Sequence, residues 1–304
     1  MTVQIVSSQI LSLVEKDPLI EKIASGFRFT EGALWNPTEK CLYFSDIPND
    51  RRLRWSEVNG VEVVRPIRKM SANKCNGMTY DANEYLYICE HSSSSVVRED
   101  AVGNREVLAS HWEGKQLNSP NDIVVKSDSS IYFTDPTYGR SRVFGKEREP
   151  ELDFQGVFRI SPTGTLNCVA DDFNQPNGLC FSIDEQILYI NDTPAALIRC
   201  FDALPNGMLV NGRIFAQNIG NGNLEGGVVD GMKIDASGNL YVTGPNGIWL
   251  FNKEGDHLGI IEMPEHTANF NWGGDNWNEL YCCCSKSIYR LKLKISGNRL
   301  AYMR

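Results

Sequence analysis

Five polar residues open five copies of a short phrase in this 304-residue chain. The copies are EGALW (31–35), NGMTY (76–80), NDIVV (121–125), NGLCF (177–181) and DGMKI (230–234), and they begin with Glu31, Asn76, Asn121, Asn177 and Asp230. Carboxylate and amide oxygens, without thiols or imidazoles, suit a hard divalent cation. The pattern predicts one such cation, calcium first, with zinc, magnesium and manganese as alternatives.

Turn formation is the competing explanation for these phrases. Asn-Gly and Asp-Gly pairs commonly form tight turns, and any single copy would fit that use. It does not explain Glu31, or Asn121 followed by Asp122. We therefore favour a metal site, with the sixth equivalent place at Asn269 or Phe270.

A second repeat follows the first and predicts the fold. An aliphatic residue and a tyrosine recur in LYFSD (42–46), LYICE (86–90), IYFTD (131–135), LYIND (188–192), LYVTG (240–244) and LYCCC (280–284). Turn-forming residues separate each copy from the apolar run before it, which predicts six hairpins. Six such units favour an all-β, six-bladed β-propeller over a pair of β-sandwiches or a solenoid.

The propeller would occupy residues 1–304 as one domain, with 1–20 as an N-terminal extension. Residues 21–29 are expected to complete the last blade beside 288–295. The first strand of each blade lines the central channel, so the five polar residues should converge at one rim. A second ring, Asp46, Glu90, Asp135 and Asp192, ends the returning strands. These acids either orient the metal ligands, or they cap turns or pair between blades, and we favour capping or pairing.

Composition excludes several classes of protein. A net charge of −8 argues against a surface that neutralises nucleic-acid phosphates. No run approaches the roughly 20 apolar residues of a membrane helix, and the N-terminus does not resemble a secretory signal. The nine cysteines include no CxxC pair and are expected to be reduced and mostly buried in a cytoplasmic protein, with 282–284 used in packing. The chain also lacks GxSxG, GxxxxGK[ST] and HExxH motifs.

The longer phrases resemble one family, the senescence-marker-protein/gluconolactonase/luciferin-regenerating family of six-bladed propellers. The matching stretches are 29–35, 76–91, 117–139, 175–193 and 230–251, and CEH, SPND, FTDPTYG and VTGPNG look most like its bacterial gluconolactonase branch. The resemblance implies a divalent cation on the axis, held by Glu31, Asn177 and Asp230 with Asn121 close by. One departure is Ser119, where the animal branch has an arginine that holds the sugar.

The activity that this resemblance implies is hydrolysis of a gluconolactone-type sugar lactone to the aldonic acid by a carboxylic-ester hydrolase. The cation would polarise the carbonyl and Asp230 would activate water. Asn121, Asn118 and Asn76 are expected to contact sugar hydroxyls. His91 is expected to bind substrate or act as a base, and a structural role is equally favoured. The implied partner is a small lactone, with neither nucleic acid nor membrane.

Other interpretations remain open. The same site could hydrolyse another lactone or an organophosphate ester, or the chain could be a non-enzymatic calcium-binding propeller. His266 and Asn269 are weaker site candidates. Phe270 and Trp272 are expected in the core, and 115–119 in an ordinary blade connection rather than a lid.

Overall fold

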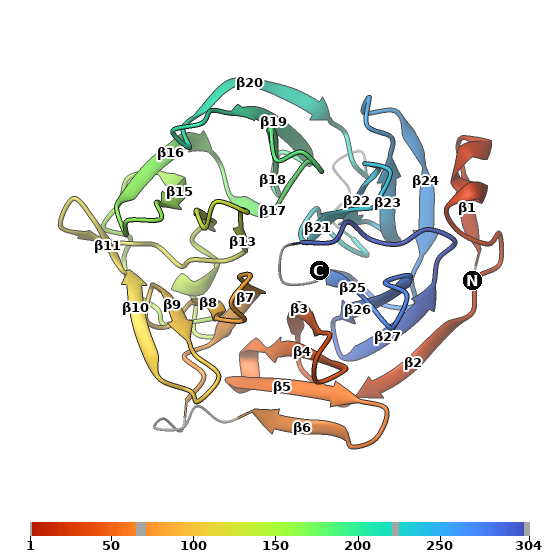
Figure 1. Cartoon of the computed structure of the whole chain (residues 1–304), viewed down its shortest axis with the longest axis horizontal. Helices are drawn as coiled ribbons and strands as arrows, with labels where there is room; N and C mark the ends of the chain where they lie inside the picture. The colour runs from red at the N-terminus through yellow and green to blue at the C-terminus, as the bar shows by residue number, and fades with distance from the viewer. Residues whose placement is uncertain (1, 65–70, 221–224, 301–304) are drawn as a thin grey trace.

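The strands form six sheets arranged around a central axis (Figure 1). The computed structural model describes residues 2–64, 71–220 and 225–300. Within these residues, a separate two-stranded hairpin adds β11 (His111–Trp112) and β12 (Lys115–Gln116). The predicted all-β, six-bladed β-propeller is therefore confirmed.

The first three blades each pair four strands in an antiparallel manner. Blade 1 contains β3 (Thr30–Asn36), β4 (Cys41–Asp46), β5 (Arg51–Ser56) and β6 (Gly60–Val64). Blade 2 contains β7 (Cys75–Tyr80), β8 (Leu86–Glu90), β9 (Ser95–Glu99) and β10 (Arg105–Ala109). Blade 3 contains β13 (Ile123–Val125), β14 (Ile131–Asp135), β15 (Gln155–Ile160) and β16 (Leu166–Phe173).

The last three blades repeat this order, and two of them recruit N-terminal strands. Blade 4 contains β17 (Pro176–Phe181), β18 (Ile187–Asp192), β19 (Leu197–Ala203) and β20 (Leu209–Ala216). Blade 5 contains β21 (Met232–Ile234), β22 (Leu240–Gly244), β23 (Gly247–Phe251), β24 (His257–Glu262) and β1 (Val3–Ile5). Blade 6 contains β25 (Thr267–Gly273), β26 (Glu279–Cys284), β27 (Ser287–Lys292) and β2 (Ile20–Ser25). Short 3₁₀ helices are η1 (Ser8–Ser12), η2 (Ile47–Asn49) and η3 (Tyr138–Arg140).

Closure of the ring joins the two ends of the chain. Strand β2 pairs with β27 through Ile20 opposite Leu291, as the sequence predicted for this blade. The segment before β2 adds β1 to the outer edge of blade 5, and Ile10 of η1 is fully buried there. Pairing β2 with β27 covers a strand edge and ties the first blade to the last.

Each repeated tyrosine contributes to its own hairpin. Tyr132, Tyr241 and Tyr281 are among the largest fully buried side chains. The Tyr241 hydroxyl donates a hydrogen bond to Asp235 at 3.2 Å, and that of Tyr281 donates to Glu279 at 2.8 Å. Because both acids lie at the hairpin turn, the tyrosine fills the core and also holds the turn.

Three of the four polar–glycine pairs lie inside the inner strands β3, β7 and β17 rather than in turns, and Asp230–Gly231 directly precedes β21. Strand register shifts between Glu31 and Leu34, between Cys75 and Met78, and between Pro176 and Leu179, so each pair sits in a β-bulge. A bulge re-aims a side chain out of the regular alternation. The turn interpretation does not hold for these copies, and the bulge gives a physical reason for the repeated phrase.

Neighbouring inner strands approach so closely that the repeated glycines have no room for a side chain. A Cβ on Gly178 would lie 2.0 Å from the Asp230 carbonyl oxygen, and one on Gly32 would lie 2.0 Å from that of Asn76. A Cβ on Gly77 would lie 2.6 Å from the Asn121 carbonyl oxygen. The glycines thus set the diameter of the channel at the polar rim.

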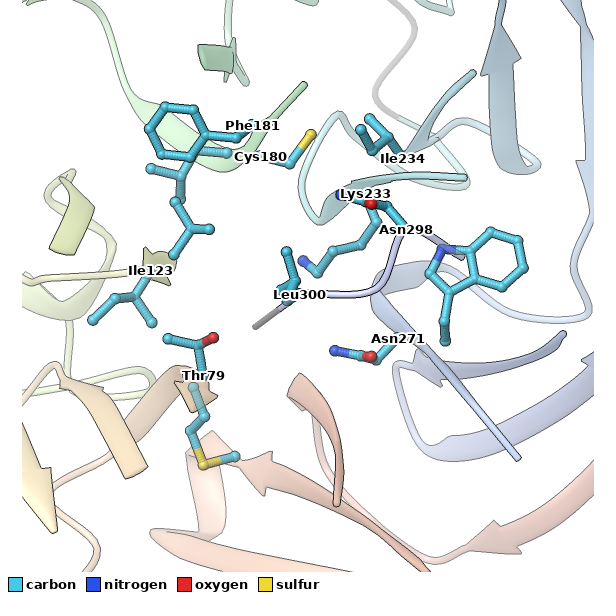
Figure 2. A pocket seen from close by; sticks show the side chains of 13 residues that line it. Thr79, Ile123, Cys180, Phe181, Lys233, Ile234, Asn271, Asn298 and Leu300 are labelled. Atoms are coloured by element: carbon cyan, nitrogen blue, oxygen red, sulfur yellow. The ribbon is translucent and has the colours of Figure 1, made fainter. Parts of the chain in front are cut away.

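Further along the same inner strands lies a second cavity of 40 Å³. Figure 2 shows Lys233 and Leu300 projecting into it. The segment that carries Leu300 is held by backbone hydrogen bonds from Gly297 to Trp277 and from Asn298 to Ile234. No helix among the described residues is long and apolar enough to cross a membrane.

Gly178→Ala should lower the free energy of unfolding by about 3 kcal/mol, because the new methyl group would overlap the backbone of Asp230. Gly164→Ala is the control: no atom lies within 4 Å of its Cβ position. Its positive φ should still make the change unfavourable by about 1 kcal/mol. Denaturant unfolding measures both values, and equal losses would contradict the close approach.

Candidate active site

A cavity of 310 Å³ opens at the rim where the inner strands begin. Six of its lining residues were predicted from the sequence as site residues: Glu31, Asn76, His91, Asn121, Asn177 and Asp230. They come from five blades, so closure of the ring is what assembles them. Whether they bind metal or substrate stays a prediction, but the structure brings the six together.

Two carboxyl groups face each other in this cavity. Glu31 Oε2 accepts hydrogen bonds from Asn269 Nδ2 at 2.9 Å and from the Gly32 amide. Glu31 Oε1 is buried without any hydrogen-bond partner. Asp230 lines the same cavity, and the Glu31 charge helps to raise its pKa. Two ionised carboxylates cannot donate a hydrogen bond to each other, so only a proton or a cation between them can offset their repulsion.

Burial and mutual repulsion raise the pKa values of both acids. Burial has the largest effect on Glu31, and the nearby Asp122 charge adds to it, so the Glu31 pKa rises to about 7. Burial, followed by the Glu31 and Asp122 charges, raises the Asp230 pKa well above its ordinary value. Such displaced pKa values inside a cavity are typical of functional sites.

Three asparagine side chains form a hydrogen-bonded chain across the floor of the cavity. Asn76 Nδ2 donates to Asn121 Oδ1, and Asn121 Nδ2 donates to Asn177 Oδ1 at 2.5 Å. Asn177 Nδ2 donates to the Thr193 hydroxyl at 3.1 Å, which in turn donates to the Val229 carbonyl at 2.7 Å. The chain fixes the amides, and Asn76 Oδ1 remains buried without a partner.

His91 connects this floor to a loop on the cavity wall. Its Nδ1 lies 2.9 Å from the Phe144 carbonyl oxygen, which can only accept, so Nδ1 carries the proton. Burial lowers the His91 pKa and favours the neutral ring. The Nε2 lone pair then accepts a hydrogen bond from Asn76 Nδ2 at 3.3 Å, whereas Asn121 Oδ1, 3.0 Å away, is itself an acceptor and supplies no hydrogen. His91 therefore lines the cavity and also holds the Phe144 segment in place.

Asp122 and Lys233 lie behind the rim and were not singled out from the sequence as a pair. Asp122 is buried, and its Oδ2 lies 4.0 Å from Lys233 Nζ. Comparison of the repeats could have found them, because Asp122 replaces the glycine of the other four copies. Lys233 stands in the DGMKI copy at the place where the other four copies have Leu34, Thr79, Val124 and Cys180.

The acids that end the returning strands hold the segments leading into the rim. Asp46 Oδ1 accepts from the backbone amides of residues 28 and 29 at 3.1 and 3.3 Å. Asp192 accepts from the amides of residues 174 and 175 at 2.8 and 3.2 Å. Asp135 accepts from the Asn118 amide at 2.7 Å, and Glu90 accepts from Asn73 Nδ2 at 2.7 Å. This is the capping role that the sequence analysis favoured.

Other candidates have different surroundings. Asn118 is fully buried, and its Nδ2 donates to the carbonyls of Asp135 and Phe154 rather than lining the cavity. Ser119 is also buried: its hydroxyl donates to Pro136 and accepts from the Gly139 amide. His266 lines the cavity with a buried Nε2 that has no partner, whereas Asn269 contacts Glu31 from behind.

Packing explains several remaining predictions. Phe270 and Trp272 are core residues, as expected, and Cys282, Cys283 and Cys284 are fully buried free thiols. The segment 115–119 begins in the β11–β12 hairpin and ends at the buried Ser119. Lining residues that the sequence analysis missed are Phe29, Ile47, Tyr138, Phe144, Thr193 and Val228.

The donor set fits a divalent cation. The described residues contain no cluster of three or more His, Cys, Asp and Glu side chains that could hold a metal. The rim instead offers two carboxylates with amide oxygens, and one carboxylate oxygen without a donor. If Glu31, Asp230 and Asp122 are ionised, Lys233 balances one charge and two remain. Calcium favours such oxygen ligands.

Comparison with known proteins shows which proteins this chain resembles. The SMP-30/Gluconolactonase/LRE-like region model matches residues 29–286. A gluconolactonase from Zymomonas mobilis is 29% identical over 96% of this chain and 86% of its own. The solved structure of XC5397 from Xanthomonas campestris, described as a gluconolactonase, has a TM-score of 0.86 at 31% identity, covering 96% of this chain and 95% of that one. Human regucalcin is 26% identical over 85% of this chain and 84% of its own.

The raised acid pKa values predict that chelator-treated protein loses stability as pH rises. Glu31 titrates near 7 when folded and near 4.5 when unfolded, so the folded state binds more protons over that interval. Its contribution to the free energy of unfolding should be present below pH 4.5 and fall by at most about 1.4 kcal/mol per pH unit up to pH 7. Denaturant unfolding at several pH values measures the slope.

Glu31→Gln should reduce this slope, because the amide does not titrate. Glu254→Gln, on an exposed turn, is the matched control. An unchanged slope in Glu31→Gln would contradict the raised pKa of Glu31. A smaller slope that remains in the variant would come from Asp230, Asp122 and Asp135, whose pKa values burial also raises.

Proposed function

This chain belongs to the SMP-30/gluconolactonase/LRE-like family, and we propose that it hydrolyses a gluconolactone-type sugar lactone to the aldonic acid. It is an enzyme of the carboxylic-ester hydrolase class, with gluconolactonases among its relatives. The observation that carries the proposal is the pair of facing acids, Glu31 and Asp230, in a 310 Å³ cavity with one carboxylate oxygen free of any donor.

We assign the cation site to Glu31, Asn177 and Asp230, with Asn121 beside them. Calcium is the first candidate ion, and zinc, magnesium and manganese are the alternatives. When bound, the cation supplies Lewis-acid polarisation of the lactone carbonyl. Its positive charge also favours the ionised form of Asp230, whose pKa is otherwise raised by burial and by Glu31.

Asp230 is the proposed base. Its carboxylate accepts a proton from a water molecule as the water oxygen forms a bond with the carbonyl carbon. The bond from that carbon to the ring oxygen then breaks, and the proton passes from Asp230 to the departing oxygen. The product is the open hydroxy acid, and Asp230 returns to its ionised state.

The remaining rim residues orient the substrate in this proposal. Asn121 and Asn76 face the cavity, and Asn76 Oδ1 is free to accept a hydrogen bond from a substrate hydroxyl. His91 Nε2 accepts a hydrogen bond from Asn76 Nδ2, and His91 lines the same cavity. Asn118, predicted as a further sugar contact, lies behind the rim with its Nδ2 engaged by backbone carbonyls, so we do not give it that role.

The decisive experiment combines metal removal with Asp230→Ala. Metal-stripped protein should hydrolyse gluconolactone no faster than the spontaneous rate, and adding calcium, zinc, magnesium or manganese singly should restore turnover. Asp230→Ala should lower kcat by about 10²-fold or more with the metal present, because the base is lost. Asp202→Ala is the control, since this acid lies on the exposed outer part of blade 4.

Calorimetric titration with each metal separates the possible failures. Full activity of metal-loaded Asp230→Ala would overturn the assignment of the base. Wild-type protein that binds metal but never exceeds the spontaneous rate would exclude gluconolactone as substrate, and the same assay would then be applied to other lactones and to organophosphate esters.

A further inference from the structure

The cavity has two unlike parts. Its floor consists of the acids and amides described above, whereas its upper wall carries Phe29, Ile47, Phe144 and Val228, which we call the apolar collar. The collar residues come from segments that enter or leave the inner hairpins at the rim. The described residues lining the cavity include no lysine or arginine.

Aromatic contacts shape the collar. The rings of Phe29 and Phe144 meet edge to face with centroids 5.3 Å apart. The His266 ring lies at a similar angle 6.0 Å from Phe29. Such perpendicular pairs are favourable aromatic arrangements, so three rings from separate segments form one continuous wall.

Hydrogen bonds from below hold this wall in place. Lys74 Nζ donates to the Pro48 carbonyl at 2.8 Å and to the Val143 carbonyl at 3.2 Å, next to Ile47 and Phe144 respectively. His91 Nδ1 donates to the carbonyl of Phe144 itself. The collar is therefore fixed before any ligand arrives, which lowers the entropy lost on binding.

The collar offers little to a hydroxyl group. A hydroxyl buried without a hydrogen bond weakens binding, and the amide donors of the floor already serve other protein groups. Beside the collar, the cavity-lining residues Tyr138 and His266 each have a buried polar atom without a partner, Oη and Nε2. A polyhydroxylated ring can use the floor, but a group that reaches the collar meets mainly carbon.

We propose that this site also accepts lactones carrying an alkyl or aryl substituent, with the lactone carbonyl on the polar floor and the apolar substituent against the collar. The proposal rests on the proposed lactonase function and extends its substrate class. Each methylene group buried there should raise kcat/KM by about fourfold, until the substituent outgrows the collar.

A homologous substrate series tests this inference with metal-loaded protein. The series is an unsubstituted six-membered lactone and its 5-methyl, 5-propyl and 5-pentyl derivatives, assayed beside gluconolactone. In wild-type protein kcat/KM should increase along the series. In Phe144→Ala the ratio of the pentyl to the unsubstituted value should fall by about tenfold or more, and Phe144→Leu should lie between the two.

Val143→Ala is the matched control, because this neighbouring side chain is 48% exposed and does not line the cavity. It should retain the wild-type ratio, and thermal unfolding of every variant confirms folding. Phe144→Leu keeps the test valid if Phe144→Ala does not fold.

The outcomes separate the two proposals. Hydrolysis of gluconolactone and of the unsubstituted lactone with no gain along the series would overturn the collar inference and leave the lactonase function intact. A gain that persists in both Phe144 variants would also overturn it. No turnover of any lactone by metal-loaded protein would reject the lactonase function, and the collar inference with it.

Discussion

The repulsion between Glu31 and Asp230 is the constraint on which the site depends. Two buried carboxyl groups face each other, and one oxygen of Glu31 has no donor. Burying like charges together is unfavourable unless a proton or a cation intervenes. Glu31 lies on the inner strand of blade 1 and Asp230 directly precedes that of blade 5, and closure of the ring prevents the two segments from moving apart.

The frame that resists this repulsion is built from repeated small features. Glycines such as Gly32 and Gly178 let neighbouring inner strands touch, and bulges at the same places turn the preceding side chains into the channel. Asp46 and Asp192 then hold the segments before the rim through backbone amides. The backbone thus fixes the positions of the rim residues, so two carboxyl groups that repel each other can remain close together.

The sequence predicted the parts of this protein that repeat. Six tyrosine phrases indicated six hairpins, and five phrases that begin with a polar residue indicated a rim, because blade geometry imposes the same local pattern each time. The collar could not be found this way, because Phe144 lies in a long connection between β14 and β15. The place of Phe29, two residues before the rim residue, is taken by Lys74, Ser119, Gln175 and Val228 in the other copies, so no apolar pattern repeats there. Asn118 shows the other limit: one residue among neighbours of the same phrase points away from the cavity, and polarity alone does not reveal which.

Departures from the repeat carry as much information as the repeat itself. Asp122 stands where the other copies have glycine, and Lys233 stands where they have an uncharged residue. Lys233 Nζ lies 4.0 Å from Asp122 Oδ2 behind the rim. Lys233 and Leu300 line a second cavity below them, and the Asp122 side chain is itself buried. Charges in such surroundings are weakly screened. The positive charge of Lys233 therefore offsets the negative charge of Asp122 and does not neutralise the rim. The negative charges of Glu31 and Asp230 then act on the open cavity, where a cation and a lactone carbonyl would bind together.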